Sequence, residues 1–141
     1  MRRPNVTNEE ELRWAEHSHV EKFGYRRKSL SSAAGGERLG CSLYEVEPGR
    51  RAWPYHHHGA NEEAIYVLEG TGTLRMGGVE VPLEKGDYAT FSASPEGAHQ
   101  LVNSSDECGE WVTGTTSFWP RQSLQRSSPD WCSSASPSTW R

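Results

Sequence analysis

Long hydrophobic runs are missing from this sequence. No stretch approaches the roughly 20 consecutive apolar residues that a bilayer-spanning helix needs, and hydrophobic residues make up only 33% of the chain. The first residues, Met1 to Pro4, lead into polar sequence rather than into the apolar segment of a secretion signal. We therefore expect a soluble, cytoplasmic protein with no membrane partner.

Cysteine and clustered positive charge are also scarce. The three cysteines, Cys41, Cys108 and Cys132, are far apart and form no CxxC pair, which argues against a cysteine-based zinc site. The 15 Lys and Arg residues are outnumbered by 19 Asp and Glu residues, and the formal net charge is −4. No basic run exceeds what a solvated surface carries, so we expect no nucleic-acid partner.

Turn-forming residues, by contrast, are abundant. With 14 glycines and 8 prolines, the 141 residues predict one all-β domain. We expect an N-terminal arm over residues 1–30, a single β-barrel domain over residues 31–120, and an irregular, poorly ordered C-terminal tail over residues 121–141. Within the arm, Glu9 to Glu16 is predicted to form a short helix with Asn8 as its N-cap.

Short β-prone runs alternate with turn signals through the predicted domain. Gly77-Gly78 lies between two alternating runs, which is a strong hairpin signal because both central positions of a primed turn need positive φ. Lys85-Gly86-Asp87 and Pro95-Glu96-Gly97 separate later runs in the same way. The predicted strands are Leu39–Glu47, Glu62–Glu69, Gly72–Met76, Val79–Leu83, Tyr88–Phe91, His99–Asn103 and Glu110–Thr116.

The most informative feature is the run His56-His57-His58, with His99 much further along the chain. We predict that the His-x-His pair lies on a strand, where His56 and His58 share one face with Cα atoms about 6.6 Å apart and His57 points the other way. That separation suits two imidazoles that bind one cation at about 2.0–2.1 Å from each nitrogen. The run lies inside the predicted domain, whereas an expression tag lies at a terminus. We therefore predict a metal site.

A carboxylate ligand is available close by, but alternation does not decide which one. Glu63 shares a strand face with Ile65 and Val67, while Glu62 shares the other with Tyr66 and Leu68. Both faces are apolar enough to be buried, so the pattern leaves Glu62 and Glu63 equally possible.

Other residues near the predicted site have less specific interpretations. Arg50 and Arg51 precede the first candidate ligand and could hold an anionic substrate, although adjacent loop arginines are usually solvated. Some of the nearby aromatic residues could line a mouth, but packing in the core or in a dimer is the better interpretation. These aromatic residues are Trp53, Tyr55, Tyr66, Phe91 and Trp111.

Two segments together resemble the cupin superfamily. The first runs from Gly49 through Pro54-Tyr55-His56-His57-His58 and Glu62-Glu63 to Gly70, and is similar to the first cupin motif. The second runs from Gly86-Asp87 through Pro95-Glu96-Gly97-Ala98-His99 to Asn103, and is similar to the second motif. The resemblance covers about residues 39 to 117. It implies a double-stranded β-helix, the jelly-roll barrel of cupins.

The resemblance also implies a ligand set. In that family six residues separate the motif glutamate from the closing glycine, which selects Glu63 in this sequence. The implied metal ligands are His56, His58, Glu63 and His99. Three imidazoles and one carboxylate suit one divalent ion of Zn, Fe, Mn, Ni or Cu. Asn103 shares the face of His99 and is expected either to contact the ligands or to have a structural role, rather than to bind the metal.

Two classes of function remain compatible with the sequence. The first is a small metalloenzyme acting on a small polar molecule, with the dioxygenase, decarboxylase or sugar-isomerase chemistry of other cupins. The second is a noncatalytic module that binds or senses a small molecule through a structural or ligand-gripping metal. We favour the enzyme because no effector segment accompanies the predicted barrel. The resemblance further implies a homodimer.

Overall fold

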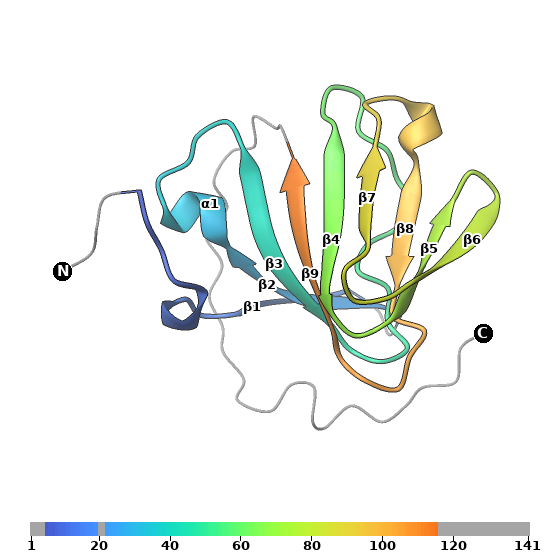
Figure 1. Ribbon diagram of the computed structural model, residues 1–141, viewed down its shortest axis with the longest axis horizontal. Coiled ribbons are helices and arrows are strands. Elements are labelled where there is room, and N and C mark those ends of the chain that lie inside the picture. The colour runs from blue at the N-terminus through green and yellow to red at the C-terminus, as the bar shows by residue number, and fades with distance from the viewer. Residues whose placement is uncertain (1–4, 20–21, 116–141) are drawn as a thin grey trace.

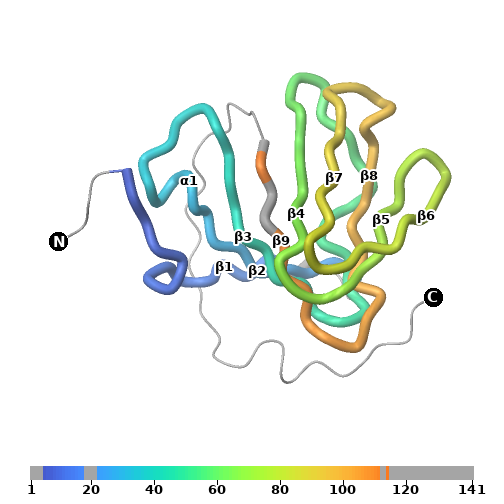
Figure 2. The backbone as a smooth tube through the Cα atoms, viewed as in Figure 1, coloured from blue at the N-terminus to red at the C-terminus, as the bar shows by residue number. Residues whose placement is uncertain are grey.

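We analysed a computed structural model that describes residues 5–19 and 22–115. Within these ranges the regular structure is almost entirely antiparallel strands, arranged as Figures 1 and 2 show. A six-stranded sheet has the order β1-β2-β3-β9-β4-β7, and a three-stranded sheet has the order β6-β5-β8. The strands are β1 (Ala15–His19), β2 (Phe23–Ser29), β3 (Gly40–Val46), β4 (Glu63–Glu69), β5 (Gly72–Met76), β6 (Val79–Leu83), β7 (Tyr88–Phe91), β8 (His99–Val102) and β9 (Gly109–Thr115); the helical turns are η1 (Glu9–Glu11), α1 (Leu30–Ala33) and η2 (Pro95–Gly97).

The seven predicted strands are confirmed as β3 to β9, and their ends agree to within one residue. The predicted hairpin joins β5 to β6, with positive φ at both Gly77 (56°) and Gly78 (78°). The predicted helix at Glu9 is a single 3-10 turn, in which the Asn8 side chain accepts a hydrogen bond from the Glu10 amide at 2.9 Å. The predicted tail over residues 121–141 lies outside the described residues.

Side chains from both sheets form one hydrophobic core. Burial alternates along β4, where Ile65 and Val67 are buried while Tyr66 and Leu68 face outward. This alternation gives β4 one face toward the core and one toward the surface, as expected for a strand in a two-layered β-fold. The buried core residues are Val46, Ala52, Ile65, Val67, Leu74, Leu83, Phe91, Leu101 and Trp111.

Two further strands, β1 and β2, extend the large sheet within the range predicted to be an arm. Strand β2 pairs with β3 from Arg26↔Glu45 to Ser29↔Ser42, and β1 pairs with β2. These strands were not predicted, because charged and polar residues dominate both segments. Pairing with the edge of an existing sheet overrides such weak local preferences.

The segment before β1 packs on the outer face of β2. The Arg26 guanidinium and the Lys28 ammonium each lie 4.5 Å from the centre of the Trp14 ring. Lys28 also donates a hydrogen bond to the Glu9 carbonyl at 2.8 Å. Lys28 also forms an ion pair with the Glu9 carboxylate, and these contacts together account for a lysine side chain that is almost fully buried.

At β4 and β7 the outer face of the large sheet is not covered by another segment of the described chain and exposes apolar side chains. Tyr66 and Tyr88, which are register partners, are 43% and 66% exposed, and Leu68 beside them is 37% exposed. An apolar face of this kind lies open on the surface of the described chain. Among the described residues, no helix has the length and apolar character to cross a membrane.

Candidate metal centre

Three segments meet where the predicted ligands lie. Glu63 is the first residue of β4, and His99 is the first residue of β8. The loop between β3 and β4 brings in His56, which forms an isolated antiparallel bridge with His99. The His56 amide donates to the His99 carbonyl at 3.1 Å, and the His99 amide donates to the His56 carbonyl at 2.9 Å. Residues 43 positions apart in sequence are thereby fixed side by side.

The strand predicted for His56 to His58 is wrong. These residues lie in the loop, and of the three only His56 has a bridge partner. Pro54, two residues before it, lacks an amide donor. The consequence expected from the strand nevertheless holds, because His56 and His58 turn their rings toward each other and His57 is exposed.

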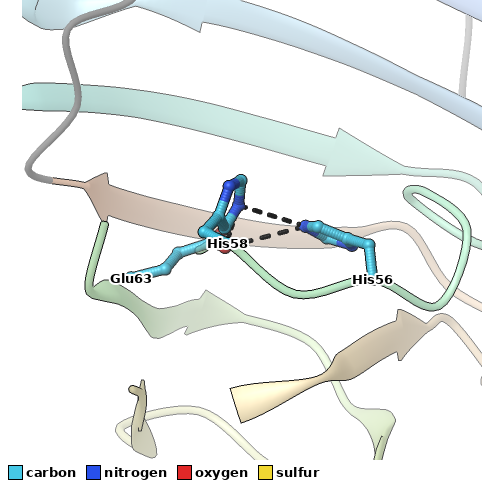
Figure 3. A group of neighbouring side chains, drawn as sticks. All are labelled: His56, His58 and Glu63. Carbon is cyan, nitrogen blue, oxygen red and sulfur yellow. Dashed lines mark hydrogen bonds and ion pairs between the residues drawn. The ribbon is translucent and has the colours of Figure 1, made fainter. Parts of the chain in front are cut away.

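The side chains of the four predicted ligands converge on one point. From Glu63 Oε2, the distance is 2.9 Å to His58 Nε2, 3.4 Å to His99 Nε2 and 3.8 Å to His56 Nε2. The Nε2 atoms of His56 and His58 are 3.2 Å apart. Figure 3 shows His56, His58 and Glu63 turned toward one another. The ligand atoms of these three residues all lie within 4.8 Å of one another, so the group could hold a metal ion.

Backbone carbonyls fix the orientation of two of the imidazoles. His56 Nδ1 lies 2.9 Å from the Pro54 carbonyl, and His99 Nδ1 lies 2.8 Å from the Gly97 carbonyl. Since a carbonyl oxygen can only accept, Nδ1 is the protonated nitrogen in each ring. In the neutral imidazole Nε2 then carries the lone pair, which is the arrangement that metal-binding histidines adopt.

Two buried atoms in this cluster lack a hydrogen bond. Glu63 Oε2 and His99 Nε2 are both inaccessible to solvent and have no hydrogen-bond partner of suitable geometry among the described residues. Buried polar atoms without partners are rare because their desolvation is not compensated. A divalent cation would satisfy both atoms, so the donor set fits a metal.

The electrostatics of the cluster keep Glu63 ionised. Burial raises the pKa of Glu63. The contacts of its carboxylate with the His56 and His99 side chains, and the positive charges of His99 and His58, outweigh the effect of burial, so the pKa falls from 4.5 to about 2. In turn, the Glu63 carboxylate raises the pKa of His56 above 6.5, against the effect of burial. An ionised carboxylate is the form that binds a metal.

Aromatic rings enclose the imidazoles. The Phe91 ring stacks on His99 with centroids 3.6 Å apart and an interplanar angle of 8°. The Trp53 ring meets His56 and His99 edge-on, with centroids 5.8 and 6.3 Å away. Phe91 and Trp53 therefore form the wall of the site, whereas Trp111 is a core residue and Tyr55 and Tyr66 are exposed.

The other residues singled out from the sequence lie apart from the cluster. Glu62 is exposed and accepts a hydrogen bond from Thr90 at 3.3 Å. Arg50 forms an ion pair with Glu47 at 3.4 Å. Asn103 is fully buried, and its amide nitrogen donates to the carbonyls of Val46 and Glu107 at 2.7 and 2.8 Å. Asn103 thus joins the end of β3 to the loop between β8 and β9, which is the structural one of its two expected roles.

Fold and cluster together define a small double-sheet β-protein with a histidine–carboxylate site between its sheets. The family model described as Cupin domain matches residues 42–114, so the chain belongs to the cupin family. No curated protein matches the sequence.

Solved structures of other cupins are similar over most of the chain. A proposed sugar phosphate isomerase from Acidithiobacillus ferrooxidans is 29% identical, with a TM-score of 0.72 over 79% of this chain and 74% of that one. A cupin sugar phosphate isomerase from Silicibacter pomeroyi is 25% identical, with a TM-score of 0.73 over 79% and 75% of the two chains. A predicted oxalate decarboxylase from Thermotoga maritima, 20% identical, shares the fold with a TM-score of 0.69 over 79% and 97%.

Proposed function

We propose that this protein is a metal-dependent enzyme that acts on a small polar molecule bound directly at the metal. The observation that carries the proposal is the convergence of four donors, His56, His58, Glu63 and His99, of which two have buried atoms without hydrogen-bond partners. These two atoms, Glu63 Oε2 and His99 Nε2, lie 3.4 Å apart, and a cation between them would compensate the desolvation of both.

The donor set supports one divalent ion among Zn, Fe, Mn, Ni and Cu, because it combines imidazoles with a carboxylate and contains no thiolate. When bound, such an ion polarises a carbonyl or carboxylate oxygen and lowers the pKa of coordinated water. Four protein donors fill part of an octahedral sphere, which leaves positions for a substrate oxygen. Oxygenase, decarboxylase and isomerase chemistry all use positions of this kind.

The residues around the ligands orient the imidazole rings and cover His99 with aromatic side chains. The carbonyls of Pro54 and Gly97 hold the rings of His56 and His99, so each Nε2 is directed before any ligand arrives. Phe91 and Trp53 pack against His99, whose side chain is fully buried, and exclusion of water there strengthens electrostatic interactions with a polar substrate.

The comparisons support a small polar substrate. Two of the similar structures, at 29% and 25% identity, are described as sugar phosphate isomerases. Sugar phosphates are small molecules rich in oxygen donors, and this type of ligand suits the proposed centre. The noncatalytic alternative differs from an enzyme in one measurable property, which is whether the metal retains exchangeable water.

We also propose that the protein is a homodimer. The exposed side chains of Tyr66, Leu68 and Tyr88 lie on neighbouring strands of the large sheet. A second copy of this face would remove their apolar surface from water.

Elemental analysis of protein purified without a histidine tag tests the metal site. We expect about one metal ion per chain in the wild type, and loss of most of that metal in His56→Ala and in His99→Ala. His57→Ala is the matched control, because His57 belongs to the same run but is exposed and is not part of the cluster that could hold a metal. Wild-type protein without metal after incubation with each of the five ions would contradict the proposal.

The relaxivity of Mn²⁺-loaded protein separates the enzyme from the noncatalytic module. Rapid exchange of metal-bound water is expected for a catalytic centre with open positions. A closed coordination shell without exchangeable water would instead support a structural metal.

A further inference from the structure

Arg27 places a positive charge on the inner face of the barrel. It pairs with Tyr44 across β2 and β3, and Tyr44 shares its strand face with the buried residues Ser42 and Val46. Paired residues point to the same side of a sheet. The Arg27 Nε donates a hydrogen bond to Ser42 Oγ at 2.9 Å, and its guanidinium carbon lies 5.8 Å from the centre of the Tyr44 ring.

A row of aromatic rings links this arginine to the candidate metal centre. The Tyr44 ring packs against Trp53 with centroids 5.5 Å apart, and Trp53 in turn meets His56 and His99. The strand register also places Arg27 near the metal centre. Thr113 of β9 is the register partner of Ser42 in β3 on one side and of Ile65 in β4 on the other, and Ile65 is two residues from Glu63. Two strand spacings and two residues correspond to a Cα separation of about 12 Å between Ser42 and Glu63.

The charge of Arg27 has no acidic partner among the described residues. Its Nε–Ser42 hydrogen bond is the one polar side-chain contact found for it within residues 5–19 and 22–115, which leaves its two terminal nitrogens without a protein acceptor there. The neighbouring Arg26, on the outer face, instead pairs with Glu45 at 2.7 Å. Two adjacent arginines therefore differ: one is neutralised by the protein and the other is not.

The groups around Arg27 also lack negative charge. His17 stacks on Tyr25 with centroids 4.8 Å apart, and these rings lie beside Arg27 on the inner face. Burial, and after it the charge of Arg27, lowers the pKa of His17, which favours the neutral imidazole. An anion reaching this part of the barrel would meet a planar cation without competing acid.

We propose that Arg27, held by Ser42, is the specificity residue that binds the anionic end of the substrate. The substrate class is then a small organic anion, with a phosphate or carboxylate group at Arg27 and oxygen donors a few bonds away at the metal centre. This inference rests on the proposed function and specifies its substrate. A guanidinium with two free terminal nitrogens recognises both kinds of oxyanion in a bidentate manner.

Calorimetric titration tests the proposal with two defined probes, inorganic phosphate and succinate. Each probe is titrated into metal-loaded and into metal-free protein. We expect Arg27→Gln to weaken binding of at least one probe by about tenfold or more in both forms, with metal content unchanged. Arg27→Lys, which keeps the charge but not the planar fork, should give an intermediate affinity and serves if Arg27→Gln does not fold. Arg38→Gln removes an exposed arginine and should leave binding unchanged.

The outcomes separate this inference from the proposed function. Equal binding by wild type and both Arg27 variants, or no binding of either probe by the wild type, overturns the role of Arg27. A wild type without metal contradicts the proposed function, but the metal-free titrations still test Arg27. Preference for phosphate would assign a phosphorylated substrate, and preference for succinate a carboxylate.

Discussion

Single atoms decide the character of the candidate site. Sequence patterns predicted the three histidines, but alternation alone left Glu62 and Glu63 equal, because both faces of the strand are apolar. The fold resolves the choice: Ile65 and Val67 are in the core, so Glu63 on the same face is buried and Glu62 is exposed. The hydrogen bonds that orient the rings could not be predicted, since they depend on where the carbonyls of Pro54 and Gly97 lie in space.

Gly97→Ala is predicted to damage the site through the backbone. A Cβ at residue 97 would lie 2.1 Å from the Ser92 carbonyl oxygen and 2.9 Å from the Ser92 amide nitrogen. The η2 turn must therefore shift, and with it the carbonyl that holds His99. We expect a loss of roughly 1–3 kcal/mol in the free energy of unfolding, together with weaker metal binding, measured by urea denaturation and by competition with a chelator.

Gly59→Ala is the matched control, because this glycine follows His58 but a Cβ there would meet nothing within 4 Å. Its stability should stay within about 0.5 kcal/mol of the wild type. Equal effects of the two substitutions would contradict the role assigned to the Gly97 carbonyl.

At the scale of elements, strong turn signals and alternation made seven strands predictable. Strands β1 and β2 were missed because the charged residues along them indicate solvent exposure, whereas the fold covers one side with Trp14 and turns the other inward. For the same reason Arg27 was not singled out: in the run Arg26-Arg27-Lys28 alternation sends only the middle residue to the inner face.

Pairing of β3 with β9 places Glu45 directly opposite Glu110. Burial, followed by the negative charges of Glu45, Glu9 and Glu69, raises the pKa of Glu110 above 4.5. The folded state binds the Glu110 proton more tightly than the unfolded state. The stabilisation that protonated Glu110 contributes to the fold is therefore present below pH 4.5 and is lost as the pH rises through the folded-state pKa. Glu110→Gln should therefore stabilise the protein at pH 7 by a few tenths to about 1 kcal/mol.

Thermal denaturation at several pH values checks this prediction. The advantage of Glu110→Gln should shrink toward zero near pH 4, where the wild-type carboxyl is protonated. Glu84→Gln, at an exposed position, should match the wild type across the range. A Glu110→Gln protein less stable than the wild type at pH 7 would show that the like-charge pair is not destabilising.

For the whole molecule, the sequence predicted the cupin barrel because two motifs in order fix both the strands and the ligands. The packing of one copy against another leaves no comparable pattern. Tyr66, Leu68 and Tyr88 are ordinary strand residues in sequence, and only the fold shows that they share an open face.

Tyr88→Arg is predicted to disrupt the proposed dimer. A charge in the centre of an apolar interface is costly to desolvate, while Tyr88 is too exposed in the single chain for the change to affect its core. Sedimentation velocity should show a dimer for the wild type and a monomer for Tyr88→Arg. Val79→Lys, at an exposed position in β6, should remain dimeric. A monomeric wild type, or dissociation caused equally by Val79→Lys, would contradict the assigned interface.

X-ray absorption spectroscopy at the edge of the bound metal tests the central claim most directly. The fine structure distinguishes imidazole, carboxylate and thiolate ligands and counts them. We predict three imidazoles from His56, His58 and His99, one carboxylate from Glu63, and at least one further oxygen from solvent. A spectrum with fewer than three imidazoles, or with sulfur in the first shell, would contradict the proposed centre.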